Sequence, residues 1–135
     1  MESTAPAAPA EKVTKEIMFD DGALYRGEID PETQFMHGQG MLIYADDSVY
    51  EGKFVMNKRE GKGEFIYPNK DVYKGKFQNG LMHGKGVFSS PDGTYFTGEW
   101  KEGKRHGEGL FRGPKGVIME IWEDGELTFE DKVGM

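Results

Sequence analysis

The sequence predicts an all-β protein, a single-layer twisted antiparallel sheet of about ten strands that is built from stacked hairpins. Three observations predict this fold. A segment recurs every 23 residues, glycines alternate with aromatic residues inside each copy, and short turn signals separate the copies. A repeat of this length is typical of an array of similar supersecondary units, in which each unit is stabilised by its neighbours.

Each copy contains two short segments with the pattern of β-strands. The first segment reads aromatic-x-Gly-x-aromatic or a close variant, and it occurs at Tyr25–Ile29, Tyr50–Phe54, Tyr73–Phe77, Phe96–Trp100 and, in divergent form, Ile118–Trp122. The second contains a Gly-x-Gly pair, at Gly38–Gly40, Gly61–Gly63, Gly84–Gly86 and Gly107–Gly109. Dipeptides such as Asn79-Gly80 and Asp92-Gly93 lie between these segments and predict hairpin turns.

The alternation assigns the two faces of the sheet. Tyr50, Gly52 and Phe54 share one face because side chains alternate along a strand, whereas Glu51 and Lys53 point to the other, solvated face. We expect each glycine to leave room for a ring of a neighbouring strand to lie flat across the backbone. Each ring can bury about 150–250 Å², which is worth about 4–6 kcal/mol.

The chain of 135 residues is expected to form one domain. Residues 1–16, with their Ala-Pro repeats, predict a disordered tail, and residues 17–125 predict the sheet of about four and a half repeats. Residues 126–135 are either an acidic tail or an edge strand. Six acidic side chains against Lys132 give residues 117–135 a net charge of −5, out of −7 for the whole chain.

Composition excludes several classes of protein. The chain has no cysteine, so disulfides and thiolate metal sites are excluded. No apolar run approaches the roughly 20 residues of a membrane helix, and the N-terminus lacks the basic start and apolar core of a secretory signal. We therefore expect a cytoplasmic protein. The repeat region carries nearly equal numbers of basic and acidic residues, so nucleic acid is not an expected partner.

The repeat resembles the MORN (membrane occupation and recognition nexus) repeat, most closely at residues 96–109, FTGEWKEGKRHGEG. The resemblance covers about residues 17–125. It implies a single-layer antiparallel scaffold without catalytic activity, in a ciliary or flagellar (axonemal, radial-spoke-like) or other cytoskeletal assembly. The first copy departs from the family pattern by a loop at 30–35, the second by Asn57 and Glu60, and the last by Glu120 in place of a strand glycine.

The residues that could suggest chemistry are better explained by the repeat. His37, His83 and His106 occupy one repeat position, so neighbouring equivalents are about 10 Å apart and cannot share a metal ion; a turn-stabilising role is expected. Gly98–Lys104 reads as a phosphate-loop lookalike, but Arg105 replaces the magnesium-binding Ser or Thr and no helix is predicted to follow. We therefore predict no catalytic residue, no cofactor and no metal.

The aromatic face is the preferred binding site. A single layer is not expected to cover its own rings, so these should form both the core and an exposed groove that takes a helical or extended segment of a partner protein. The rings of this face are Tyr25, Tyr44, Tyr50, Phe54, Tyr67, Tyr73, Phe77, Phe96 and Trp100.

A basic edge supports an alternative function. Stacked hairpins should align seven basic residues near one family of turns, either as a soluble rim or as the contact of a membrane-surface adaptor with anionic lipid. Association of two copies into a homo-oligomer also stays open. The basic residues are Lys58, Arg59, Lys62, Lys85, Lys101, Lys104 and Arg105.

Overall fold

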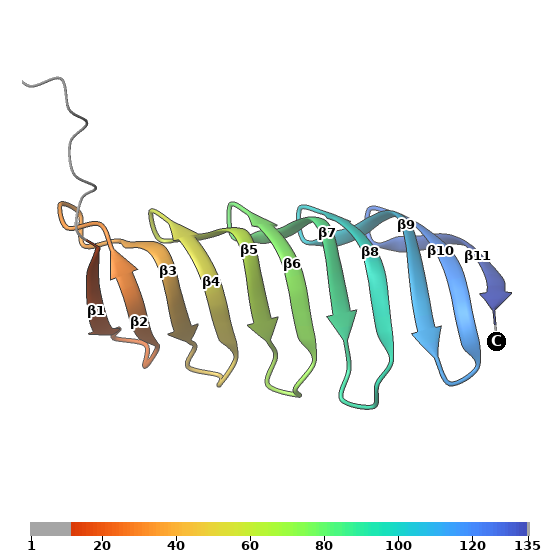
Figure 1. The fold of residues 1–135 in the computed structure, drawn as a ribbon, viewed down its shortest axis with the longest axis horizontal. Coiled ribbons are helices and arrows are strands. Elements are labelled where there is room, and N and C mark those ends of the chain that lie inside the picture. Colours follow the sequence, from red (N-terminus) through yellow and green to blue (C-terminus); the bar gives the residue numbers. More distant parts are fainter. Residues whose placement is uncertain (1–11, 135) are drawn as a thin grey trace, which may run out of the picture.

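A computed structural model describes residues 12–134 as one open antiparallel sheet of eleven strands (Figure 1). Each strand pairs with its neighbours in chain order, and these residues form no helix, so the predicted fold class is confirmed. The strands are β1 Val13–Met18, β2 Leu24–Ile29, β3 Met36–Ile43, β4 Val49–Val55, β5 Lys58–Ile66, β6 Val72–Gln78, β7 Leu81–Ser89, β8 Tyr95–Lys101, β9 Lys104–Gly113, β10 Gly116–Glu123 and β11 Glu126–Gly134.

Two families of turns lie at opposite ends of the hairpins. The upper turns of Figure 1 join even-numbered to odd-numbered strands, and four of them are two-residue loops in which both residues have positive φ, as at Asn79 (52°) and Gly80 (84°). This geometry matches the right-handed twist of the strands. In the lower turns, the carboxylates of Asp46 and Asp92 accept hydrogen bonds from both the hydroxyl and the backbone N–H of Ser48 and of Thr94, respectively, and these bonds lower the pKa of both carboxyls.

The first glycine of each Gly-x-Gly pair bends its strand. Gly61 and Gly84 have φ values of 69° and 78°, in the left-handed region that glycine adopts without strain. The pairing of each such strand with the preceding strand shifts by two residues at this point: Gly52 pairs with Gly63, but Phe54 pairs with Arg59. An insertion of this kind is a β-bulge, which bends and twists the strand, and it recurs at the pairings of β2 with β3, β4 with β5, β6 with β7 and β8 with β9.

The bends fold the upper part of each hairpin over the aromatic face. The Arg59 guanidinium lies 5.3 Å from the centre of the Phe65 ring, although both residues belong to β5 and stand near its opposite ends. The Tyr67 hydroxyl lies 3.9 Å from the Met82 sulfur, which comes from the start of β7. The aromatic face is therefore the inside of the bend.

Enclosure buries the rings, so the predicted open groove is wrong for most of its residues. Tyr25, Tyr50 and Tyr73 are 0% exposed. The remaining buried rings pack edge-to-face between these tyrosines in a continuous series. The Tyr50 and Phe54 ring centroids lie 5.0 Å apart, and those of Tyr50 and Phe77 lie 5.1 Å apart. The seven buried rings are Tyr25, Tyr50, Phe54, Tyr73, Phe77, Phe96 and Trp100.

The second glycine of each pair packs against an aromatic ring of the preceding strand, as the sequence predicts; the ring is a tyrosine in three copies and Phe96 in the fourth. A Cβ atom at Gly63 would lie 2.4 Å from the Tyr50 hydroxyl oxygen, so no larger residue fits without displacing the ring. The Tyr50 hydroxyl then donates a 2.8 Å hydrogen bond to the backbone carbonyl of Lys53, at the bulge. Burial raises the pKa of Tyr50 to about 12, and it does the same for Tyr25 and Tyr73.

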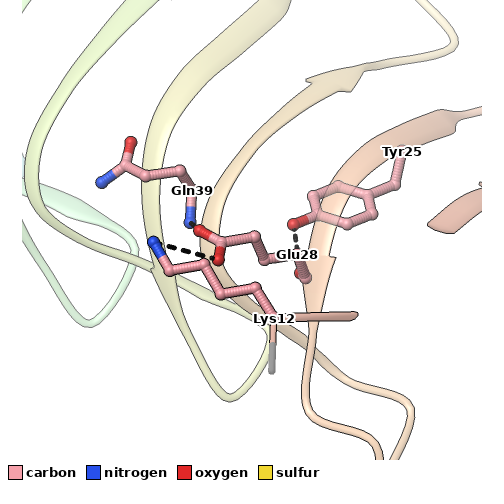
Figure 2. A network of polar contacts seen from close by, with 4 residues as sticks. All are labelled: Lys12, Tyr25, Glu28 and Gln39. Carbon is pink, nitrogen blue, oxygen red and sulfur yellow. Dashed lines mark hydrogen bonds and ion pairs between the residues drawn. The ribbon is translucent and has the colours of Figure 1, made fainter. Parts of the chain in front are cut away.

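Figure 2 shows the first copy of this arrangement. The Tyr25 hydroxyl donates to the backbone carbonyl of Glu28 over 2.6 Å. The Glu28 carboxylate accepts a 2.6 Å hydrogen bond from the backbone N–H of Gln39 and lies 3.6 Å from the Lys12 ammonium. Glu28 thus connects Tyr25 of β2 to the adjoining strand β3 and to Lys12, the residue that precedes β1.

The sheet begins before its predicted N-terminal boundary, and it includes the C-terminal segment that the sequence left open. Residues 13–16 belong to β1 and are not part of a disordered tail, because Val13 and Ile17 pair with Ile29 and Tyr25 and continue the alternation; residues 1–11 lie outside the described range. At the other end, Glu126–Gly134 forms β11, an exposed edge strand. The structure thus places this segment in the second of the two alternatives that the sequence left open.

We predict that Gly63→Ala destabilises the sheet by about 2 kcal/mol or more, because the new methyl group must displace the buried Tyr50 ring. Gly93→Ala is the matched control: its φ is also positive, at 92°, but nothing lies within 4 Å of the added Cβ, so we expect a loss of about 1 kcal/mol from backbone strain alone. Urea denaturation of both variants measures the difference. Equal losses would contradict the ring–glycine contact.

We also predict that stability falls as the pH rises from about 10 towards 12. A tyrosine whose folded-state pKa is raised stabilises the fold fully below its unfolded value, near 10, and loses this contribution as the pH approaches the folded value, about 12. The double variant Tyr50→Phe/Tyr73→Phe should lose about 1 kcal/mol per hydrogen bond at neutral pH but show a weaker alkaline decline. Thermal melts of both proteins across this pH range measure the difference. An equally steep loss of stability in the double variant would show that Tyr50 and Tyr73 are not the groups responsible.

Candidate functional site

A row of partly exposed rings remains along the margin of the enclosed aromatic face. We call Tyr44, Phe65, Tyr67 and Phe88 the aromatic strip. Their centroids follow one another at 5.7 Å from Tyr44 to Phe65, 4.7 Å from Phe65 to Tyr67 and 5.6 Å from Tyr67 to Phe88. The strip therefore offers a partner a continuous apolar surface.

The ends of odd-numbered strands position the strip. Phe65 and Tyr67 point to the aromatic face because they lie two residues apart, at the end of β5 and just after it, and Phe88 repeats the Phe65 position on β7. Of the predicted rings, only Tyr44 and Tyr67 belong to the strip. Phe65 and Phe88 were missed, although their 23-residue spacing and their alternation with the glycines were available signals.

The electrostatics of the strip come from Arg59. Its guanidinium lies 5.3 Å from the Phe65 centroid and 5.5 Å from that of Phe77, distances typical of cation–π contacts. Burial raises the pKa of Tyr44 and of Tyr67, and the positive charge of Arg59 partly opposes both shifts. Both phenols therefore stay neutral in ordinary buffers and can donate hydrogen bonds to a partner.

A hollow of about 460 Å³ continues the strip at its N-terminal end. Tyr44 belongs to both surfaces, and Asp20 and Asp21 add carboxylates to an otherwise mostly apolar wall. We call it the first-hairpin hollow; its residues are Phe19, Asp20, Asp21, Ala23, Met36, Leu42 and Tyr44.

The predicted basic edge does not form one strip. Lys58, Lys101 and Lys104 are exposed beside the upper turns. Arg59 and Arg105 instead turn over the buried rings, and the Arg105 guanidinium lies 4.3 Å from the Phe96 centroid. Lys62 and Lys85 stand within β5 and β7 and point to the opposite face of the sheet. The prediction failed because alternation within a strand sends residues near the same turn to different faces.

Glu120 occupies the strand-glycine position of the last copy and is only 8% exposed. It accepts a 3.1 Å hydrogen bond from the indole N–H of Trp122, whose ring stacks 4.9 Å from the Arg105 guanidinium. Burial lowers the pKa of Arg105, and the charge of Glu120 partly opposes this shift. A carboxylate thus replaces the glycine where an arginine is available to balance it.

Two of the three histidines, His37 and His106, contact turns as the sequence predicts. His37 Nδ1 accepts a 3.1 Å hydrogen bond from the backbone N–H of Met56, and His106 Nδ1 accepts a 3.4 Å bond from that of Asp124. Glu60, at the same repeat position, accepts an equivalent bond from Asn79. Across residues 12–134, no three His, Asp or Glu side chains gather in a way that could hold a metal ion.

The phosphate-loop lookalike also has no helix. Gly98 lies in β8 and Lys104 begins β9, so this segment runs from strand to turn to strand. Over the described part of the chain, the structure has no helix of the length and apolar character that a membrane crossing requires.

Comparison with known proteins gives three results. The MORN repeat family matches four consecutive segments, residues 35–49, 50–72, 73–95 and 96–118. No curated protein matches. Among solved structures, the chain is similar to the TCP domain of SAS-4 (dCPAP) of Drosophila melanogaster, determined in complex with a proline-rich motif of Ana2 (dSTIL). Identity is 14% and the TM-score 0.47, over 92% of this chain and 74% of that one. Four matched repeats in register, on a sheet of stacked hairpins, show that this chain belongs to the MORN repeat family.

Proposed function

We propose that the protein is a non-catalytic scaffold that binds a segment of another protein along the aromatic strip and the first-hairpin hollow. The continuous, partly exposed row of rings is the observation that carries this proposal. Exposed aromatic surface of this kind is enriched at protein interfaces. MORN repeats generally serve as scaffolds, which agrees with this role.

The geometry suggests the size of the bound segment. The strip crosses from β3 to β7, which is four strand spacings or about 19 Å. A helix of about 13 residues or an extended segment of about six residues covers that length. In either form, an apolar side chain would enter the hollow, and a basic residue beside it would meet Asp20 and Asp21.

Location within the cell is proposed from the family resemblance alone. We propose a cytoplasmic protein of a cytoskeletal assembly, specifically of a cilium or flagellum. Fluorescence microscopy of the tagged protein beside an axonemal marker tests this, and a diffuse signal in ciliated cells would contradict it.

Membrane attachment is the second candidate function, and the exposed Lys58, Lys101 and Lys104 beside two of the upper turns favour it. Lys101 and Lys104 are directly paired across β8 and β9, so two positive charges lie side by side. If this edge binds anionic lipid, co-sedimentation with vesicles containing phosphatidylserine should be salt-sensitive and lost in Lys101→Glu/Lys104→Glu. Binding that this variant retains would exclude the edge.

For the main proposal, we predict that Tyr67→Ser abolishes capture of the partner in cross-linking pull-downs from native cells, because it interrupts the strip at its centre. Tyr95→Ser is the control: Tyr95 is 36% exposed and alternates with the buried Phe96, so it lies on the opposite face. Circular dichroism establishes that both variants are folded. Full capture by a folded Tyr67→Ser variant, or equal loss in both variants, would refute the site.

A further inference from the structure

The face opposite the rings carries lysines on four successive strands. We call Lys53 of β4, Lys62 of β5, Lys76 of β6 and Lys85 of β7 the lysine row. Lys62 and Lys76 are directly paired across β5 and β6. Lys53 follows Gly52, which pairs with Gly63, and Lys85 precedes Gly86, which pairs with Gly75. The side chains of both lysines therefore point to the same face as those of Lys62 and Lys76. All four side chains are exposed.

The lysine row has no acidic partner within ion-pair distance. Among residues 12–134, the ion pairs are Lys12–Glu28, Arg26–Glu16 and His106–Asp124, and none of them involves the row. Like charges that face one another on adjacent strands are destabilising. The free protein therefore keeps an unfavourable arrangement at the centre of this face.

The repeat fold does not require these lysines. The position of Lys62 and Lys85 is occupied by Gln39 in an earlier copy and by Glu108 in a later one. The position of Lys53 and Lys76 is occupied by Glu99 in the next copy. The row is thus a property of the central repeats, and the outer repeats show that the backbone accepts neutral or acidic residues there.

A shallow depression of about 680 Å³ accompanies the row. The backbone of Gly52, Gly63 and Gly75 forms the floor of the depression, between the charged side chains of neighbouring residues. The depression is lined by Gln39, Glu51, Gly52, Lys62, Gly63, Glu64, Lys74, Gly75, Lys76 and Lys85. Three lysines of the row, Lys62, Lys76 and Lys85, therefore line this surface together with Lys74.

We propose that the lysine row binds an acidic segment of a partner protein, at a second surface independent of the aromatic strip. Four lysines on adjacent strands, about 4.8 Å apart, span about 14 Å. Carboxylates three or four residues apart on a helix are about 5–6 Å apart, which is a similar spacing. An acidic helix of about ten residues that lies across the strands would place one carboxylate near each lysine.

The surroundings of the row favour a polypeptide over a membrane or a nucleic acid. Glu51 and Glu64 line the same depression, and Glu99 is paired with Lys85 at the C-terminal end of the row. These carboxylates would repel a uniformly anionic surface, whereas a polypeptide can place basic residues against them. Beyond the row, Val87 and Leu110 are 36% and 46% exposed on the same face and offer apolar contacts.

The test uses the full chain and a fluorescent synthetic helical peptide with glutamates three and four residues apart. We expect salt-sensitive binding, which is absent for the same peptide with glutamines. Lys62→Glu/Lys76→Glu should weaken binding by about tenfold or more, because it reverses two central charges. The control Lys70→Glu/Lys115→Glu makes the same change of net charge at exposed lower turns and should alter binding by less than about twofold.

The single variant Lys62→Glu provides a readout that is independent of binding. It places a carboxylate opposite Lys76, so the midpoint of thermal unfolding should rise while peptide affinity falls. A gain in stability together with a loss of peptide affinity is expected if Lys62 serves ligand binding at the expense of stability.

Three results would overturn the proposal. The first is no binding of the glutamate peptide at low salt, and the second is equal weakening in the row variant and the control. The third is binding of phosphatidylserine vesicles through the row without binding of the peptide, which would assign the row to a membrane surface. Each result concerns the lysine face only and leaves the Tyr67→Ser experiment on the aromatic strip unaffected.

Discussion

The contact between a tyrosine ring and the glycine of the neighbouring strand is the constraint on which this sheet depends. The ring can lie flat only because the glycine has no Cβ atom, and its hydroxyl then reaches the carbonyl at the bulge, as Tyr50 reaches Lys53. The bulge in turn bends the strands, and the bend closes the upper part of each hairpin over the rings. Ring, glycine and bulge are therefore mutually dependent, which explains why they recur together in each repeat.

The hairpins and the face of each ring follow from the sequence, because a 23-residue period and a two-residue alternation are local signals. The enclosure of the rings does not follow in the same way. It depends on positive φ at residues such as Gly61 and Gly84, and glycine in a strand is equally compatible with a straight backbone. The sequence interpretation assigned both glycines of each pair to contacts with rings. It therefore did not predict the bend or the burial of Phe54 and Trp100 that the bend causes.

The same bend decides which residues were misplaced in the candidate sites. Arg59 and Arg105 look like exposed turn residues in the sequence, but the bend lays them over aromatic rings. Lys62 was assigned to an edge by its nearness to a turn, although alternation places it on the outer face. The N-terminal end was predicted too short and the C-terminal end was left open, because Val13–Met18 and Glu126–Gly134 have little of the repeat motif, yet both segments pair with their neighbouring strands.

The pairing of each strand with its chain neighbours alone also governs how such a protein can change in evolution. Duplication of one 23-residue unit would add two strands, lengthening the sheet by about 10 Å. Because adjacent strands are rotated by about 20–25°, the same duplication would turn the far end by about 40–50°. The number of repeats therefore sets both the separation and the relative orientation of whatever is attached at the two ends.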